Sequence, residues 1–335
     1  MTTRSPATPS PTAGPVLSGI HHVTAVTADA QSNIDFYAGV LGLRLVKLTV
    51  NFDDPRSFHL YYGDERGSPG TVLTFFEWPG IPRGRVGPPQ VTATAFAVPA
   101  GSLDDWAARL REHQVEVGPP VERLGERVLQ FADPDGMPLE IVGVEAPAGE
   151  PWAAGPVPVA HAIRGFHSVT LSEEGYERTA DTLTSLMGFA PAGEEGNRFR
   201  YRAGAPNAPV LAPTIDLLCA PDARHGQMGA GIVHHVAFRT PDAAQHAQWR
   251  ERIAARGLNV SPVMDRTYFH SIYYREPGGV LFEIATDAPG FTADEPLETL
   301  GQSLTLPPQH ERFRPQIQAR WAHLRLPAQS GTGRR

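Results

Sequence analysis

Cysteine and long apolar runs are almost absent from this sequence. Cys219 is its one cysteine, so neither an intramolecular disulfide framework nor a metal site built from several thiolates can form. A bound metal would therefore need histidine and carboxylate ligands. No stretch approaches the roughly 18 apolar residues of a membrane span, and the first residues lack the apolar segment of a secretory signal. We expect a soluble, cytoplasmic protein that does not interact with a membrane.

Positive charge is also in short supply. The 335 residues include 29 Lys and Arg against 36 Asp and Glu, which gives a net charge of −7. This balance argues against broad electrostatic binding of nucleic acid and favours a small-molecule partner. The length favours two domains of about 150 residues each. A homo-oligomer is compatible with this composition.

Internal repeats organise the chain. Residues 19–46 resemble residues 165–192, and residues 91–117 resemble residues 232–260. In the first copy His22 lies 20 residues before Gly42, and in the second copy Ser168 lies 20 residues before Gly188. Self-similarity of this kind indicates duplicated supersecondary units. We therefore predict four modules, which begin near residues 19, 91, 163 and 231.

Each module is predicted to contain a strand, a helix and then two or three strands, a βαβββ unit. In the first module Ile34, Tyr37 and Leu41 recur at helical spacing, and Gly42 follows where a glycine commonly ends a helix. The first helix should therefore end near Leu41. Paired modules of this type form half-barrels around a cleft, so the expected fold class is α+β with two half-barrel domains.

The predicted organisation has five parts. A Pro/Ser/Thr-rich N-terminal tail, residues 1–16, is expected to be disordered. The other parts are modules 1 and 2 (17–146), a linker rich in proline, alanine and glycine (147–162), modules 3 and 4 (163–290) and a C-terminal extension (291–335) with a docked helix near 314–324.

Two histidine doublets, 21–22 and 234–235, begin modules one and four. Neighbouring side chains of a strand point to opposite faces, so one histidine of each doublet should face a given cleft. Across the four modules the second doublet position is His22, Ala93, Ser168 and His235, and the late-strand acid is Glu140 in module two and Glu283 in module four. If modules one and four share a cleft, His22, His235 and Glu283 meet there, whereas pairing one with two or three with four leaves each site a ligand short.

Two imidazoles and one carboxylate on one face of a metal leave up to three positions open, as in non-haem Fe(II) oxygenases. Substrate and dioxygen can bind there together. A glyoxalase-type isomerase or lyase would need a fourth protein ligand, and the module-one counterpart of Glu283 lies near Thr74, a poor ligand. Catalytic zinc fits the ligand count, but the His-Glu-x-x-His helix of zinc proteases is missing. A non-catalytic small-molecule binding protein is a further alternative, against which the complete triad argues.

Several spaced motifs resemble the vicinal-oxygen-chelate superfamily, and within it the ring-cleaving, extradiol-like dioxygenases that act on para-hydroquinones. These motifs are GIHHVT (19–24), HLYYGDERGSPGTVLTFF (59–76), GIVHHVAFRT (231–240), DRTYFHSIYYREPGGVLFEIATD (265–287) and LPPQ (306–309). The resemblance implies Fe(II), or Mn(II) in some members, bound by His22, His235 and Glu283. It also implies an aromatic diphenol substrate, O2 as co-substrate, and pairing of the first and fourth modules.

The resemblance further implies that Thr24, His234, Arg266 and Tyr273 are catalytic residues of the pocket, with His21 beside them. Strand alternation agrees for Thr24, which shares a face with the ligand of its own strand. Alternation places His21 and His234 on the opposite faces of their strands unless a bulge turns the chain.

Hairpin geometry gives a separate test for Tyr273. A three-residue loop, Pro277 to Gly279, would place Tyr273 opposite Glu283, whereas a two-residue loop would place Ile272 there. We predict the three-residue loop.

The remaining histidines and aromatic residues have more ordinary interpretations. Histidines without a partner at matching spacing are expected to be structural or exposed, with His270 as the strongest exception. These are His59, His113, His161, His225, His246, His270, His310 and His323. The aromatic cluster Tyr61, Tyr62, Phe75, Phe76 and Trp78 is expected to pack the half-barrel rather than stack on a substrate.

Overall fold

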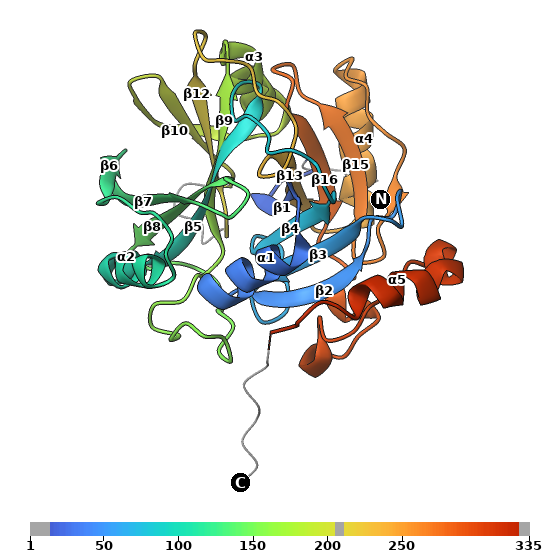
Figure 1. The fold of residues 1–335 in the computed structure, drawn as a ribbon. Coiled ribbons are helices and arrows are strands. Elements are labelled where there is room, and N and C mark those ends of the chain that lie inside the picture. The colour runs from blue at the N-terminus through green and yellow to red at the C-terminus, as the bar shows by residue number, and fades with distance from the viewer. Residues whose placement is uncertain (1–13, 205–210, 328–335) are drawn as a thin grey trace, which may run out of the picture.

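The protein is described by a computed structural model over residues 14–204 and 211–327, in which a run of strand, helix and three strands occurs four times (Figure 1). The first run contains β1 (Ile20–Thr27), α1 (Ala30–Ile34), the π-helical turn η1 (Asp35–Val40), β2 (Arg44–Val50), β3 (Phe58–Gly63) and β4 (Val72–Glu77). The second contains β5 (Gln90–Pro99), the 3-10 turn η2 (Ala100–Ser102), α2 (Leu103–Glu112), β6 (Val121–Arg123), β7 (Glu126–Ala132) and β8 (Pro138–Val144).

The second half of the chain repeats this order and adds a C-terminal extension. The third run contains β9 (Phe166–Glu173), α3 (Glu177–Asp181), η3 (Thr182–Leu186), β10 (Ala190–Glu195), β11 (Arg198–Arg202) and β12 (Thr214–Cys219). The fourth contains β13 (Val233–Thr240), α4 (Ala243–Ala255), β14 (Met264–Asp265), β15 (His270–Arg275) and β16 (Leu281–Thr286). The extension contains η4 (Phe291–Ala293), η5 (Leu297–Thr299), η6 (Pro308–Phe313) and α5 (Arg314–Trp321).

The strands form two curled eight-stranded sheets, which confirms the predicted α+β class and the two half-barrels (Figure 1). One sheet has the order β14-β15-β16-β13-β1-β4-β3-β2 and combines the fourth run with the first. The other has the order β10-β11-β12-β9-β5-β8-β7-β6 and combines the third run with the second. The expectation that modules one and four share one cleft is therefore confirmed.

The sheets are not the halves of the sequence. Residues 17–146 and 163–290 each contribute four strands to each sheet, so each half-barrel needs both parts of the chain. The connection between them is packed rather than exposed at Trp152 and Val157, which are 5% and 4% exposed. The domain boundaries predicted from the sequence, 17–146, 147–162 and 163–290, stay a prediction about the order of modules along the chain. The predicted disorder of residues 1–16 lies almost wholly outside the described residues.

The repeated glycines end the helical segments of modules one and three. Gly42 has φ +71° and Gly188 has φ +79°, a left-handed conformation that glycine adopts without steric cost. The first helical segment runs through η1 to Val40, with Leu41 as its cap, as the spacing predicted. Its start is fixed by Asp29, whose side chain accepts a hydrogen bond from the backbone N–H of Ser32. Of the helices described, none has the length and apolar character needed to cross a membrane.

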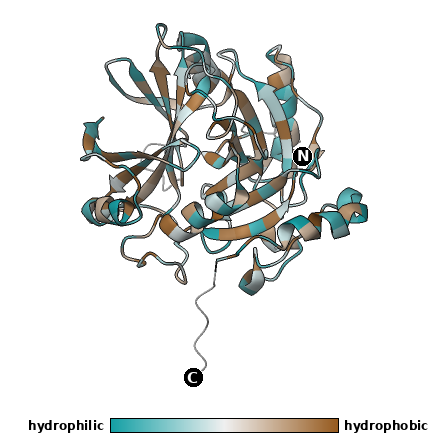
Figure 2. Ribbon diagram, in the orientation of Figure 1, coloured by the Kyte–Doolittle hydropathy of each residue, from teal (hydrophilic) through white to brown (hydrophobic). Residues whose placement is uncertain are grey.

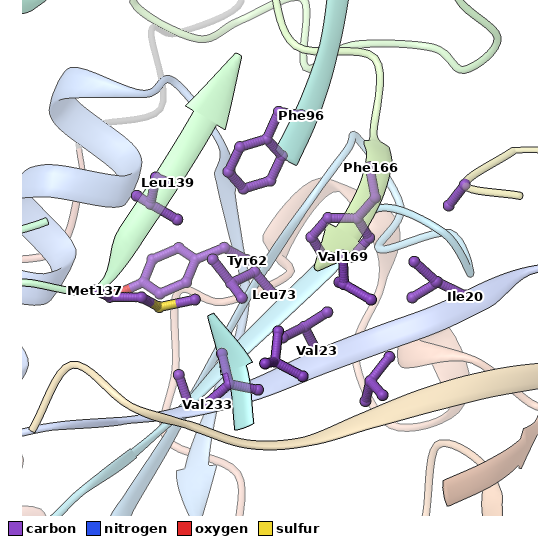
Figure 3. Close-up of a cluster of buried hydrophobic side chains, with 14 of the residues drawn as sticks. Ile20, Val23, Tyr62, Leu73, Phe96, Met137, Leu139, Phe166, Val169 and Val233 are labelled. Carbon is purple, nitrogen blue, oxygen red and sulfur yellow. The ribbon is translucent and has the colours of Figure 1, made fainter. Parts of the chain in front are cut away.

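A continuous hydrophobic core joins the two sheets. Val23 of β1 and Leu73 of β4 belong to the same cluster as Phe96 of β5 and Val169 of β9 (Figure 3). Figure 2 shows apolar residues concentrated along the strands and hydrophilic residues frequent on helices and loops. Because one face of each sheet packs in this shared core, the two half-barrels are held together by apolar burial.

The C-terminal extension lies beside β2 (Figure 1). Leu304 forms a bridge to Leu48, and the fully buried ammonium group of Lys47 binds the carboxylates of Asp294, at 2.6 Å, and Glu295. The docked helix expected near 314–324 is present as α5. A buried ion pair therefore fastens the extension to the first sheet.

Removing the Lys47 ammonium should destabilise the fold. Lys47→Ala leaves two carboxylates, one of them almost wholly buried, without their cation, and loss of one partner of a buried pair costs about 3–5 kcal/mol. Urea unfolding measures this loss. Arg127→Ala is the control, because its 3.7 Å contact with Asp104 is solvent-exposed and should add no measurable stability. Equal midpoints for Lys47→Ala and the wild type would contradict the assignment.

Candidate metal centre and its cavity

Three residues far apart in the sequence form a buried cluster in the first sheet. His22 Nε2 lies 3.3 Å from His235 Nε2. The Oε2 atom of Glu283 lies 3.2 Å from His22 Nε2 and 2.9 Å from His235 Nε2. Among the described residues, this is the one group of three or more His, Cys, Asp or Glu side chains whose ligand atoms converge closely enough to bind a metal ion. The predicted triad is therefore brought together.

The donor set fits a six-coordinate metal that keeps open positions. Ligand atoms on adjacent corners of an octahedron with bonds of about 2.1 Å lie about 3.0 Å apart, close to the three separations observed. Burial lowers the pKa of His235 and so favours the neutral imidazole that binds metals. Burial alone would raise the pKa of Glu283, but His22 and His235 outweigh it and lower that pKa well below its usual value. Glu283 is therefore an anion.

Both histidine doublets lie at β-bulges, so side chains do not alternate regularly between the two faces of the strand there. Between Ile20 and His22 the pairing of β1 with β13 shifts by one residue, so Ile20 joins the apolar core with Val23 rather than the face of His22. A second shift opposite Thr24 and Ala25 accommodates His234. A bulge inserts one extra residue and re-aims the side chains beside it. The exception stated for alternation, a bulge, is therefore present at both doublets, and His21 and His234 lie against the ligand histidines.

The two outer histidines contact the ligand histidines ring to ring. His21 Nδ1 lies 2.9 Å from His22 Nδ1, and His234 Nδ1 lies 2.8 Å from His235 Nδ1. A neutral imidazole that binds a metal through Nε2 carries its proton on Nδ1, so with a metal bound each ligand ring would donate to its outer neighbour. Burial and the adjacent His235 lower the pKa of His234 to about 3, which keeps that ring neutral and able to accept.

A small cavity of about 30 Å³ opens on His22 and His235 of the triad. Its walls contain three of the predicted pocket residues, Thr24, Arg266 and Tyr273, whereas His234 lies behind His235, near the rings of Phe76 and Trp78. The complete lining is His22, Thr24, Asn51, Phe52, Asp53, His59, Tyr61, Phe76, His235, Arg266, Phe269 and Tyr273. The cavity therefore combines polar groups near the triad with aromatic walls.

Tyr273 lies directly opposite Glu283 in the β15–β16 pair, so the predicted three-residue hairpin loop is confirmed. The Tyr273 hydroxyl lies 3.4 Å from Arg266 Nε, and Arg266 also contacts Asp53 at the cavity rim. Burial, then the charge of Glu283, raises the pKa of Tyr273, so its hydroxyl stays protonated. Thr267, which follows Arg266, has φ +66°, a strained conformation for a β-branched residue and one that tight functional turns tolerate.

Sequence reasoning missed part of the cavity. His59, interpreted as structural or exposed, lines it and is buried. The prediction that the aromatic cluster packs the half-barrel holds for Tyr62 and Phe75, which lie in the core. Tyr61 and Phe76 instead face the cavity. The β2–β3 loop also contributes Asn51, Phe52 and Asp53. His270 is not among the lining residues.

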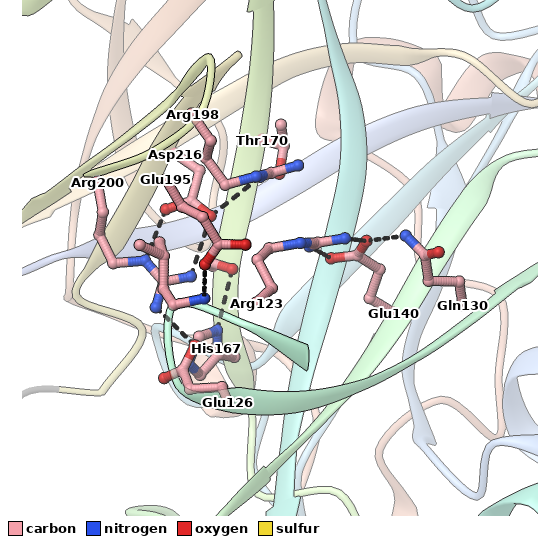
Figure 4. A network of polar contacts seen from close by, with 12 residues as sticks. Arg123, Glu126, Gln130, Glu140, His167, Thr170, Glu195, Arg198, Arg200 and Asp216 are labelled. Carbon is pink, nitrogen blue, oxygen red and sulfur yellow. Dashed lines mark hydrogen bonds and ion pairs between the residues drawn. The ribbon is translucent and has the colours of Figure 1, made fainter. Parts of the chain in front are cut away.

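The second half-barrel places ion pairs at the corresponding positions (Figure 4). Arg123 binds both carboxylate oxygens of Glu140, at 2.7 and 2.9 Å. Arg198 and Arg200 bind Asp216. Arginines neutralise these carboxylates and the second doublet positions hold Ala93 and Ser168, so no comparable metal triad forms among the described residues of this sheet.

Comparison with known proteins identifies the family. Residues 19–141 and 165–284 match the Glyoxalase/Bleomycin resistance protein/Dioxygenase superfamily. The chain belongs to this superfamily. Maize glyoxalase I shares the superfamily fold at 14% sequence identity, with a TM-score of 0.59 over 80% of this chain and 92% of that one. The resemblance stated from the motifs is therefore confirmed.

More similar relatives within the superfamily cover nearly the whole chain. MhqO of Bacillus subtilis (strain 168), provisionally named a ring-cleaving dioxygenase, is 49% identical over 90% of this chain and 94% of its own. The chlorohydroquinone/hydroquinone 1,2-dioxygenase of Sphingobium indicum is 37% identical over 90% and 95%. A crystal structure of a provisionally named dioxygenase from Bacillus subtilis subsp. subtilis str. 168 superposes with a TM-score of 0.87 at 46% identity, covering 95% and 99%.

Loss of any triad ligand should reduce metal binding. His22→Ala, His235→Ala and Glu283→Gln each remove one converging donor atom, so metal content per mole of folded protein should fall after loading and desalting. Elemental analysis measures it. Glu140→Gln is the control, because Glu140 binds Arg123 in the other sheet. Unchanged metal content in all three ligand variants would contradict the site.

Loss of an outer histidine should weaken metal binding without removing a ligand. His21→Phe and His234→Phe each delete the acceptor of a ligand ring's Nδ1–H, and loss of such a partner typically costs about 10–100-fold in metal affinity. Competition with a chelator measures the affinity. His167→Phe is the matched control, because His167 holds the same position relative to Ser168 in the second half-barrel. An equal effect of all three substitutions would point to general destabilisation instead.

Proposed function

We propose that this protein is an Fe(II)-dependent dioxygenase that cleaves the aromatic ring of a hydroquinone-like diphenol with O2. The observation that carries the proposal is the buried triad of His22, His235 and Glu283 opening on an aromatic-walled cavity. The names of the full-length relatives, one of them a chlorohydroquinone/hydroquinone 1,2-dioxygenase, support the same reaction class. Mn(II) has the same ligand preferences and is the alternative metal.

Three protein ligands on a six-coordinate metal would leave up to three positions open. His22, His235 and Glu283 would hold Fe(II), which when bound would supply open coordination positions and the redox chemistry that activates O2 toward a phenol. The cavity presents Phe76 and Phe269 as flat apolar walls, and Phe269 lies 5.0 Å from the His22 ring. These walls would hold an aromatic ring beside the triad and exclude water from it.

Two residues are suited to stabilise negative charge that develops on oxygen. Tyr273 keeps its hydroxyl proton because its pKa is raised by burial and then by the charge of Glu283. Arg266 keeps its positive charge because Tyr273 and Asp53 together offset the effect of its burial on its pKa. Thr24 supplies a further hydroxyl to the cavity wall. Preorganised donors of this kind act where charge appears in the transition state.

The isomerase alternative lacks its fourth ligand. Thr74 pairs with the residue two positions after His22, just as Glu283 pairs with the residue two positions after His235. Thr74 therefore occupies the position corresponding to Glu283, and its hydroxyl is a weak metal ligand. This exchange favours oxygen chemistry over isomerisation, and a glutathione-adduct assay tests the alternative directly.

Oxygen incorporation tests the proposal. Protein loaded anaerobically with Fe(II) should consume O2 when given a substituted hydroquinone, and both atoms of isotope-labelled O2 should enter the ring-opened product. Tyr273→Phe should lower the rate by about 10–1,000-fold, as loss of one preorganised donor does. Tyr274→Phe, which removes a hydroxyl packed against Met187, is the matched control. Absence of oxygen incorporation across a panel of para- and ortho-diphenols would falsify the function.

A further inference from the structure

Four buried side chains form an unbroken hydrogen-bond chain along one wall of the cavity. Thr24 Oγ1 lies 2.8 Å from Thr74 Oγ1, which lies 2.9 Å from His59 Nε2. His59 Nδ1 lies 2.8 Å from the Tyr61 hydroxyl. All four residues are at most 7% exposed. The reaction proposed above assigns no role to Thr74, His59 or Tyr61. The hydrogen-bond chain that they form therefore has another explanation.

Which group donates in each of these hydrogen bonds follows from the number of protons that each group carries. The Tyr61 hydroxyl has one proton, and His59 Nδ1 is its one hydrogen-bond partner among the described residues. If His59 donated instead, the Tyr61 proton would have no acceptor among the described residues, and leaving it unpaired costs about 1–3 kcal/mol. Tyr61 therefore donates to Nδ1, and His59, being neutral, has its own proton on Nε2.

The rest of the chain is then determined. His59 Nε2–H donates to Thr74, whose hydroxyl has Thr24 as its other partner. Thr74 therefore donates to Thr24, and the proton of Thr24 is directed away from Thr74 toward the cavity that Thr24 lines. We propose that His59 is a positioning residue: held in its Nε2–H tautomer by Tyr61, it acts through Thr74 to make Thr24 a hydrogen-bond donor to the ligand.

This direction has a consequence for the ligand. A donor at Thr24 requires an acceptor opposite it. An anionic oxygen accepts more strongly than a neutral hydroxyl, so this direction favours binding of the ligand oxygen as an anion. On the proposed function, on which this inference rests, that oxygen is the phenolate of the diphenol. Burial, and then the nearby His22 and His235, lower the pKa of His59 well below its usual value, so the imidazole stays neutral and carries one ring proton.

The repeated architecture supports an assigned role for this wall. Tyr61 pairs with Thr74 as Tyr273 pairs with Glu283. In module four, Ser271 donates to Glu283 at 2.5 Å, and the residue at the position of Ser271 in module one is His59. Where module four supports a metal ligand, module one supports a hydroxyl chain that ends at the cavity.

Anaerobic binding of 4-nitrophenol tests the inference without turnover, because the phenol and its coloured phenolate absorb differently. Metal-loaded wild-type protein should bind the phenolate and lower the apparent pKa of the bound phenol. Thr74→Val and His59→Leu should weaken phenolate binding by about tenfold to a hundredfold, the value of a hydrogen bond to a charged group. They should leave metal content unchanged. Phenolate binding at wild-type affinity in both variants would overturn the proposal.

Further variants separate positioning from packing. His59→Gln keeps an N–H donor toward Thr74 and should restore binding that His59→Leu loses. The Thr74→Val/His59→Leu double variant should bind the phenolate no more weakly than Thr74→Val alone, because both substitutions interrupt the same hydrogen-bond chain. Tyr61→Phe should weaken binding, whereas Tyr62→Phe, whose hydroxyl binds Asn33 in the core, should not.

The outcomes also distinguish this inference from the proposed function. If the wild type binds the phenolate through this chain but no diphenol is cleaved, the function fails and the inference stands. Additive losses in the double variant would contradict the relay through Thr74 even if ring cleavage is confirmed.

Discussion

The antiparallel pairing of β1 with β13 is the constraint on which the site depends. It sets Thr24 opposite His235 and His22 opposite Ala237, so two histidines 213 residues apart come within contact of each other. Glu283 reaches them because β16 runs parallel to β13 and pairs with the same Ala237. A slip of one residue in either pairing would turn a ligand to the other face of its strand. The register of the sheet therefore determines the geometry of the candidate metal site.

The bulges that aim the histidines belong to the fold rather than to the metal site. The β5–β9 pair has Ala93 opposite Thr170, the same register as His235 opposite Thr24. Its pairing shifts at Thr92 and at His167, the positions that correspond to the outer histidines. Bulges occur here without a metal triad. The backbone therefore offers a doublet position in every module, and the side chains placed there decide what it does.

The sequence was sufficient to predict the triad because repeat comparison needs only corresponding positions, and Ser168 and Ala93 differ plainly from histidine. It was insufficient for His21 and His234, because alternation assumes regular strands and a bulge has no local signal in these residues. His59 was missed for another reason. The segments 59–62 and 271–274 share a pattern that ends in two tyrosines, and aligning them would have placed His59 beside the site. Only the register of β3 and β4 shows that its ring meets Thr74.

The two half-barrels show how one duplicated frame supports different chemistry through charge. Both present a carboxylate at the same register, since Glu140 pairs with Ala95 as Glu283 pairs with Ala237. A buried carboxylate needs a compensating cation. In the second sheet Arg123 supplies that cation as a side chain. In the first sheet Glu283 contacts His22, His235 and the Ser271 hydroxyl but, among the described residues, no arginine or lysine, so its buried charge is left for a bound metal ion to neutralise. The same electrostatic requirement that an arginine satisfies in one sheet makes the triad of the other sheet a candidate metal centre.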